Sequence, residues 1–284
     1  MRLARAKPNS LLMDLSSPRN PIAVPPDAGA VAEQLAAVVV EAGGVARDMF
    51  ARGITSWSKH NDSPVTDADI AVDTLLKQKL GALAPDYGWL SEETADMPAR
   101  LERRRVWIVD PIDGTRAFMA GGPDWAVAAA LVEDGRPIAG ALFAPVTQEL
   151  FLAAVGCGAT RNGAPIRASN AHAVAGARAD GPAHWLSRVD RAGMLARVPR
   201  IRSLALRIAR VATGELDAAF AAPNGNDWDL AAADLLVHEA GGRLTDLDGL
   251  QLIYNAPVPR HGALVSAGAG LHPSVMDAAR RDEE

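Results

Sequence analysis

Two tight-turn signals in the middle of the chain restrict the fold more than any other feature of the sequence. Asp134-Gly135 separates the stretches WAVAAALVE and RPIAGALFAP, and both are long and apolar enough to form strands. Asn162-Gly163 interrupts a second pair of strand-like stretches in the same way. These dipeptides favour the left-handed turns that close two-residue β-hairpins. Consecutive hairpins predict a largely antiparallel sheet and exclude a purely parallel Rossmann or TIM-barrel fold.

Helical patterns flank this region. Apolar spacing predicts a helix over Gly29–Arg52. A second helix restarts at Thr66, because Thr66 as N-cap and Asp69 three residues later form a capping-box signature. The chain therefore has a mixed α/β organisation in two layered halves. In the second half we expect, in order, a strand near Arg200–Ser203, a helix over Leu204–Thr213, a strand over Leu216–Ala222 and a helix over Asp229–Ala240.

Length and composition predict a soluble globular protein with one large domain or two small ones. The chain has 284 residues, of which 49% are hydrophobic and 22% charged, and this is enough to bury a substantial core. Residues 1–26 are rich in Pro, Ser and Asn, which indicates a flexible tail. Residues 27–284 then form a single domain, with one half over about residues 27–170 and the other over about residues 171–284.

Charge and cysteine content exclude several kinds of partner. The formal net charge of −5 opposes binding to nucleic acids and gives no attraction to anionic membranes. No stretch approaches the ~20 apolar residues of a transmembrane helix, and the N-terminus lacks a secretory signal. The single Cys157 excludes an intramolecular disulfide and suits a reducing cytoplasm. We expect a cytoplasmic protein without membrane or nucleic-acid partners.

Acidic residues at the ends of predicted elements indicate a cation site. The strand Val106–Asp110 runs from four apolar residues directly into a carboxylate, whose burial is costly unless another charge compensates it. Asp113 follows three residues later. Oxygen ligands without neighbouring His or Cys favour Mg²⁺, Mn²⁺ or Ca²⁺ over zinc. The other acids at element ends are Glu92, Glu93, Asp69 and Asp229, and the last two, taken singly, also fit helix N-caps.

Four motifs in order resemble the inositol monophosphatase superfamily of metal-dependent, lithium-sensitive phosphomonoesterases. They are SPVTDAD, SEE, DPIDGT and DWDLAAADLLVHEAGG, and the resemblance covers nearly the whole chain from about Ala28. It implies a layered αβαβα sandwich. It also implies an Mg²⁺-dependent phosphomonoesterase that hydrolyses a small phosphorylated metabolite by means of metal-activated water. Two or three Mg²⁺ ions per site, with Mn²⁺ as an alternative, and a homodimer are compatible with this resemblance.

The resemblance also implies roles for individual residues. Gly114 and Thr115 match the backbone amides that hold the substrate phosphate, with Asp113 and Asp229 also in contact with the substrate. Thr115 and Asp69 match the pair that orients and activates the attacking water, and Glu92 is a further catalytic residue. Lys59 falls near the early lysine of the family. Five residues match the metal ligands: Glu92, Asp110, Ile112 through its carbonyl, Asp113 and Asp229.

The stretches DSPVTDADI, LSEE and PDWAVAAAL most resemble bacterial 3'(2'),5'-bisphosphate nucleotidases, which act on substrates such as adenosine 3',5'-bisphosphate. Arg202, Arg207 or Arg210 could then meet the second, non-reacting phosphate, although these arginines also fit a solvated helix face. Asn226 or Asp227 could also reach the substrate. The alternative is an inositol-1-monophosphatase, or a related sugar phosphate or histidinol phosphate phosphatase.

Two further classes stay open on the residues alone. The first is a metal- or phosphometabolite-binding relative without activity, which the complete set of ligand types disfavours. The second is a structural or partner-binding protein in which the acids only cap helices. The position of Asp110 at the end of an apolar strand argues against that second class.

Overall fold

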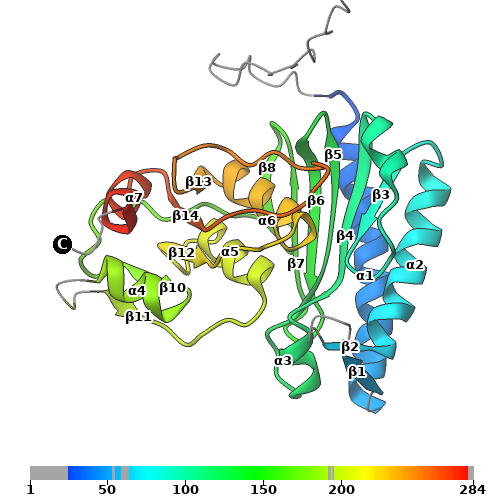
Figure 1. Ribbon diagram of the computed structural model, residues 1–284, viewed down its shortest axis with the longest axis horizontal. Coiled ribbons are helices and arrows are strands. Elements are labelled where there is room, and N and C mark those ends of the chain that lie inside the picture. Colours follow the sequence, from blue (N-terminus) through cyan, green and yellow to red (C-terminus); the bar gives the residue numbers. More distant parts are fainter. Residues whose placement is uncertain (1–24, 53–54, 59–63, 191–192, 194, 281–284) are drawn as a thin grey trace, which may run out of the picture.

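The structure is a computed structural model that describes residues 25–52, 55–58, 64–190, 193 and 195–280. Layers of helices and sheets alternate along its long axis (Figure 1). This αβαβα sandwich is the predicted fold. The predicted tail, apart from residues 25 and 26, and Lys59 lie outside the described residues. From one end the layers are α1 (Ala28–Arg52) with α2 (Asp67–Leu83), a seven-stranded sheet, α5 (Leu204–Ala212) with α6 (Asp227–Glu239), a five-stranded sheet, and α4 (Ala183–Val189) with α7 (His272–Arg280).

The seven-stranded sheet has the strand order β3-β4-β5-β6-β7-β8-β9 and is antiparallel except for the β3–β4 pair. Both predicted hairpins are present in it. Asp134 and Asn162 have φ values of 48° and 50°, in the left-handed region that these turns require. Its strands are β3 (Gly88–Ser91), β4 (Arg105–Asp113), β5 (Ala126–Glu133), β6 (Arg136–Ala144), β7 (Glu149–Ala154), β8 (Gly158–Arg161) and β9 (Ala164–Pro165).

The five-stranded sheet has the order β11-β10-β12-β14-β13 and forms most of the second half. The expected strand near Arg200–Ser203 is absent from it, and this prediction was wrong. An apolar Ile201 between two arginines imitates the alternation of a strand, but the backbone groups of Ile201 bond to side chains instead of a neighbouring strand. The strands are β10 (Arg178–Asp180), β11 (Ala196–Arg197), β12 (Ala218–Ala221), β13 (Gly242–Asp246) and β14 (Leu264–Gly268).

Helices α5 and α6 lie between the two sheets. A single apolar cluster joins their side chains to those of the seven-stranded sheet, so this core crosses the expected boundary near residue 170. Helix α6 begins two residues before the predicted Asp229, because Asn226 is its N-cap and Asp229 closes a capping box. The remaining elements are a small sheet of β1 (Ser56–Ser58) and β2 (Pro64–Thr66), η1 (Pro98–Glu102) and α3 (Thr115–Met119).

Helix α1 is the one helix among the described residues that is long and apolar enough to cross a membrane. It meets this criterion by length and composition only, as buried core helices also do. Its apolar composition has a source in the fold, because Leu35, Val39, Ala42 and Ala46 are buried in the core that α1 and α2 form with the seven-stranded sheet. Burial of one face is the ordinary reason for an apolar helix in a globular core.

Candidate active site

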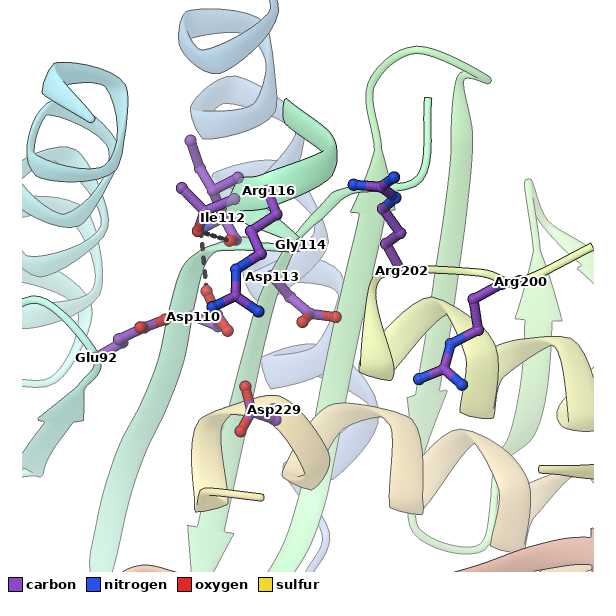
Figure 2. A pocket seen from close by; sticks show the side chains of 10 residues that line it. Glu92, Asp110, Ile112, Asp113, Gly114, Arg116, Arg200, Arg202 and Asp229 are labelled. Carbon is purple, nitrogen blue, oxygen red and sulfur yellow. Dashed lines mark hydrogen bonds between the residues drawn. The ribbon is translucent and has the colours of Figure 1, made fainter. Parts of the chain in front are cut away.

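The carboxyl ends of β3 and β4 bring the first acids together. Ser91 pairs with Val109 in the parallel register of these strands, so Glu92 follows beside Asp110. Pairing of β4 with β5 is irregular between Asp110 and Asp113, which turns the end of β4 away from a regular strand. Asp229 arrives from the first turn of α6. Figure 2 shows these acids converging from three elements.

Three of the carboxylates form a compact, shielded cluster. Asp110, Asp113 and Asp229 each offer an oxygen, and these oxygens lie within 4.8 Å of one another. Burial, reinforced by the charge of Glu92, raises the pKa of Asp110 well above its usual value. Burial and the charge of Asp113 raise the pKa of Asp229 to about 7. Burial also raises the pKa of Asp113. The negative charges of these carboxylates therefore repel one another, and a bound cation would relieve this repulsion.

One carboxylate of this cluster is short of hydrogen-bond donors among the described residues. Asp110 is 1% exposed, and its Oδ1 accepts a hydrogen bond from the Ile112 N–H at 3.0 Å. The described residues offer no hydrogen-bond partner to its buried Oδ2. A buried carboxylate oxygen without a partner is costly. Since the surrounding donors are all oxygens, these residues fit a hard divalent cation such as Mg²⁺.

A sharp turn after β4 places Gly114 and Thr115 beside the cluster. Gly114 has φ 95°, and a Cβ at this position would lie 2.6 Å from the Asp124 carbonyl oxygen, so both the conformation and the space require glycine. Helix α3 begins at the next residue. The Thr115 hydroxyl donates to the Ile112 carbonyl oxygen at 3.1 Å. This contact fixes the turn against the end of β4.

Asp69 combines a capping role with a place near the cluster. Its Oδ2 accepts from the Thr66 N–H at 2.7 Å and from the Thr66 hydroxyl at 2.6 Å, so the predicted capping box is confirmed. Asp69 is 1% exposed, and its charge is among those that raise the pKa of Asp110. Asp69 therefore both caps α2 and lies close enough to Asp110 to affect its charge.

A cavity of about 520 Å³ opens above the carboxylates. The structure brings to it every residue predicted as a metal ligand or as a contact of the reacting phosphate. Arg116 and Arg200 were missed by the sequence analysis, and no motif marks Arg200, whereas Arg116 directly follows the DPIDGT motif. The lining residues are Glu92, Asp110, Ile112, Asp113, Gly114, Thr115, Arg116, Arg200, Arg202 and Asp229.

Two of the three arginines predicted to meet a second phosphate do not line this cavity. Arg207 is 4% exposed and bonds to Asp180 and to backbone carbonyls. Arg210 donates from Nη1 and Nη2 to the two carboxylate oxygens of Glu149, at 2.6 and 2.5 Å. Because Arg207 and Arg210 form ion pairs with Asp180 and Glu149 away from the cavity, Arg202 is the one of these three arginines that lines it.

The expected substrate contacts from Asn226 and Asp227 are also absent from the cavity lining. Asp227 is completely buried. Its carboxylate accepts from the Asn255 N–H at 2.6 Å and lies 2.7 Å from Nε2 of His261. Asp227 therefore anchors the start of α6, and Asn226 caps that helix.

This fold places buried Asp110 and Asp113 beside half-buried Glu92 and Asp229, and the arrangement defines a protein with a site for hard cations. The sequence matches the inositol monophosphatase family over residues 28–281, and the chain belongs to that family. It is therefore a phosphatase that acts on phosphoric monoesters.

Similar proteins carry several substrate names. A histidinol-phosphatase of Mycobacterium tuberculosis is 40% identical over 231 residues, which cover 77% of this chain and 85% of that one. A 3'(2'),5'-bisphosphate nucleotidase CysQ of Aggregatibacter actinomycetemcomitans is 31% identical over 229 residues, with 77% and 85% covered. The crystal structure of the extragenic suppressor protein suhB from Bartonella henselae aligns with a TM-score of 0.78 at 26% identity, and covers 89% of this chain and 100% of that one.

Proposed function

We propose that this phosphatase is an Mg²⁺-dependent 3'(2'),5'-bisphosphate nucleotidase, with adenosine 3',5'-bisphosphate as a typical substrate. One observation carries the proposal: a single cavity holds the buried carboxylates and three exposed arginines, Arg116, Arg200 and Arg202. The acids suit cations beside a reacting phosphate, and the arginines suit a second anionic group of the same substrate.

The metal ions would be held by Glu92, Asp110, Asp113, Asp229 and the carbonyl of Ile112. Support comes from the buried, unpartnered Oδ2 of Asp110 and from the all-oxygen donor set. When bound, Mg²⁺ neutralises phosphate charge and lowers the pKa of a coordinated water. We propose two or three ions, with Mn²⁺ as a substitute and Li⁺ as an inhibitor that occupies one of these positions.

The chain's own residues would bind the phosphate and orient the water. The backbone amides of Gly114 and Thr115 would hold the reacting phosphate, with Asp113 and Asp229 also close to the substrate. Thr115 and Asp69 would orient and activate the attacking water, with Glu92 as a further catalytic residue. The position of Thr115 in the cavity lining and the nearby charge of Asp69 support this assignment.

The arginines would select the substrate. Figure 2 shows the Arg116 side chain reaching down to the carboxylates of Asp110 and Asp113. Arg200 and Arg202 both lie to the right of these acids, with the end of Arg202 directed upward and that of Arg200 directed downward in this view. We infer that Arg200 and Arg202 bind the non-reacting phosphate by bidentate contacts. The binding energy of this second phosphate would then help to hold the reacting phosphate in the right position and orientation for attack by the water.

Histidinol phosphate is the second candidate substrate, because a relative at 40% identity is named a histidinol-phosphatase. Its ammonium and imidazole groups would meet a cavity wall of three arginines. Among the described residues, the acids that line the cavity are the four proposed metal ligands Glu92, Asp110, Asp113 and Asp229. Like-charge contact of this kind disfavours binding, so we rank the bisphosphate nucleotide first.

A substrate panel tests the proposal. Phosphate release in saturating Mg²⁺ would be measured for adenosine 3',5'-bisphosphate, histidinol phosphate, inositol 1-phosphate and fructose 1,6-bisphosphate. We expect the highest kcat/KM for the nucleotide, and inhibition by Li⁺ at tens of millimolar, an order-of-magnitude range for a weakly held hard cation. A higher kcat/KM for histidinol phosphate or inositol 1-phosphate would replace the nucleotidase by that alternative. Cytoplasmic localisation and a homodimer stay predictions.

A further inference from the structure

Arg200 and Arg202 lie on an extended segment that belongs to no sheet. The segment follows β11 and ends at Ser203, the N-cap of α5. Both arginines line the cavity, whereas Ile201 between them packs against the apolar core. Without ladder hydrogen bonds, other contacts must fix the direction of this segment.

We propose that the buried ion pair between Arg207 and Asp180 positions the subsite for the second phosphate, by holding Ile201 so that Arg200 and Arg202 face the cavity. The proposal rests on the proposed nucleotidase function. Arg207 and Asp180 touch no substrate in it, because neither lines the cavity. They are positioning residues.

The ion pair binds both backbone polar groups of Ile201. Oδ2 of Asp180 accepts from the Ile201 N–H at 2.8 Å and from Nε of Arg207 at 3.1 Å. Nη2 of Arg207 donates to the Ile201 carbonyl oxygen at 2.7 Å, and Nε lies 3.2 Å from the same oxygen. Asp180 comes from the end of β10 and Arg207 from α5, so two rigid elements hold one residue of the segment.

Further contacts fix the ion pair and the end of the segment. Nη1 of Arg207 donates to the Phe220 carbonyl oxygen at 3.1 Å, which ties the guanidinium to β12. The Ser203 hydroxyl donates to Asp113, and the Ala205 N–H donates to Oδ2 of Asp113 at 2.7 Å. The segment is thus fixed at Ile201 and at Ser203, and the two arginine side chains between and beside these points remain exposed.

Stability alone does not explain such a pair. Asp180 and Arg207 are 2% and 4% exposed, and removing two charges from water costs free energy that their attraction often fails to recover. Apolar residues of similar volume in place of a buried ion pair are frequently neutral or stabilising. If the pair serves to position Ile201, a variant with two apolar residues in its place should fold but bind the second phosphate more weakly.

The test is the double variant Asp180→Leu/Arg207→Met, which removes both buried charges. It also removes the weaker ion pair of Asp180 Oδ1 with Nε of Arg200 at 3.8 Å, a second contact by which Asp180 positions the subsite. Two substrates share the reacting phosphate and differ only in the second one: adenosine 3',5'-bisphosphate and adenosine 3'-monophosphate. We expect KM for the bisphosphate to rise about tenfold, the size of one lost charge-assisted contact. KM for the monophosphate and kcat for both should stay near wild type. Equal changes for both substrates, or no change, would overturn the proposal.

A matched control is Arg178→Gln, which removes the ion pair of Arg178 with Asp217 (3.0 Å) from the same strand β10. It should alter neither KM. The variant Arg200→Ala/Arg202→Ala tests the subsite itself. If it leaves KM for the bisphosphate unchanged, the nucleotidase subsite is wrong and the positioning role falls with it. If it raises that KM while the Asp180/Arg207 double variant does not, only the positioning role is wrong.

A second variant covers the case in which the double variant does not fold. Arg207→Lys keeps a positive charge beside Asp180 but lacks the planar fork that reaches Asp180 and Ile201 together. We expect the same selective rise in KM for the bisphosphate, at least severalfold. An unchanged ratio of the two KM values in a folded Arg207→Lys protein would overturn the proposal.

Discussion

At the scale of single residues, Asp110 carries the strongest expectation. Asp110→Asn should abolish nearly all phosphate release in saturating Mg²⁺. The metal-free variant should be at least as stable as the wild type, because an amide removes a charge that burial and neighbouring acids destabilise. Activity assays and thermal unfolding in a chelator measure the two effects.

A control for Asp110→Asn is Asp246→Asn, which changes an acid outside the cavity that accepts from the backbone N–H groups of Asp248 and Leu250. It should keep full activity and lose some stability instead. Near wild-type turnover of Asp110→Asn would contradict the metal assignment.

Thr115 and Asp69 should behave as one unit. Thr115→Ala and Asp69→Asn are each expected to lower kcat strongly, and the double variant should be little worse than either, because groups that act on one water are not additive. Single-turnover assays of the three variants provide the measurement. Additive losses would leave Asp69 with only its capping contacts to Thr66.

At the scale of elements, neighbouring glycines in α1 test how closely the helix packs on the sheet. A Cβ on Gly43 would lie 2.9 Å from Cε1 of Phe143 and 3.0 Å from Cγ of Pro145, whereas a Cβ on Gly44 meets nothing within 4 Å. Gly44→Ala should therefore stabilise the protein by about 0.5–1 kcal/mol through helix propensity. Gly43→Ala should destabilise it by about 1–3 kcal/mol through overpacking. Urea unfolding compares them, and equal effects would contradict the close contact.

The contact between β7 and α5 should depend on pH. Arg210 holds Glu149 in a two-bond ion pair, and this hydrogen bonding lowers the pKa of Glu149 below its ordinary 4.5. Since the folded-state pKa is lowered, the pair stabilises the fold fully above pH 4.5, and this stabilisation is lost as pH falls through the folded-state pKa. Arg210→Met should cost about 1–2 kcal/mol at neutral pH. In urea titrations the deficit should shrink in acid, and a constant deficit would contradict the link.

At the scale of the whole molecule, metal binding should stabilise the packing of the seven-stranded sheet against α6. Glu92 follows β3 and Asp110 lies in β4, both in the seven-stranded sheet, whereas Asp229 belongs to α6 between the sheets. Mg²⁺ at about 100 times its Kd should add about 2.7 kcal/mol of stability. For a chain of this size, that raises Tm by about 4–5 °C. Calorimetry should show the shift in the wild type and none in Asp110→Asn; a shift of equal size in both would place the stabilising ion elsewhere.

Much of this protein follows from local sequence. The turns at Asp134-Gly135 and Asn162-Gly163, the capping box of Thr66 and Asp69, and the apolar strand into Asp110 involve neighbours along the chain, so pattern and propensity were sufficient to predict them. The carboxylate site was predicted as a set because its members lie in motifs that resemble a known family.

Only the tertiary structure decided where the arginines point. Arg116, Arg200 and Arg202 line one cavity because the fold brings α3 and the segment before α5 to the same place, although the two are far apart in the sequence. Arg207 of α5 points into the protein because Asp180 of β10 compensates its charge there. The residues near Arg207 in the sequence do not indicate that Asp180 is its partner. The direction of a long charged side chain depends on which charge the fold brings beside it, and that is a property of packing rather than of the sequence around it.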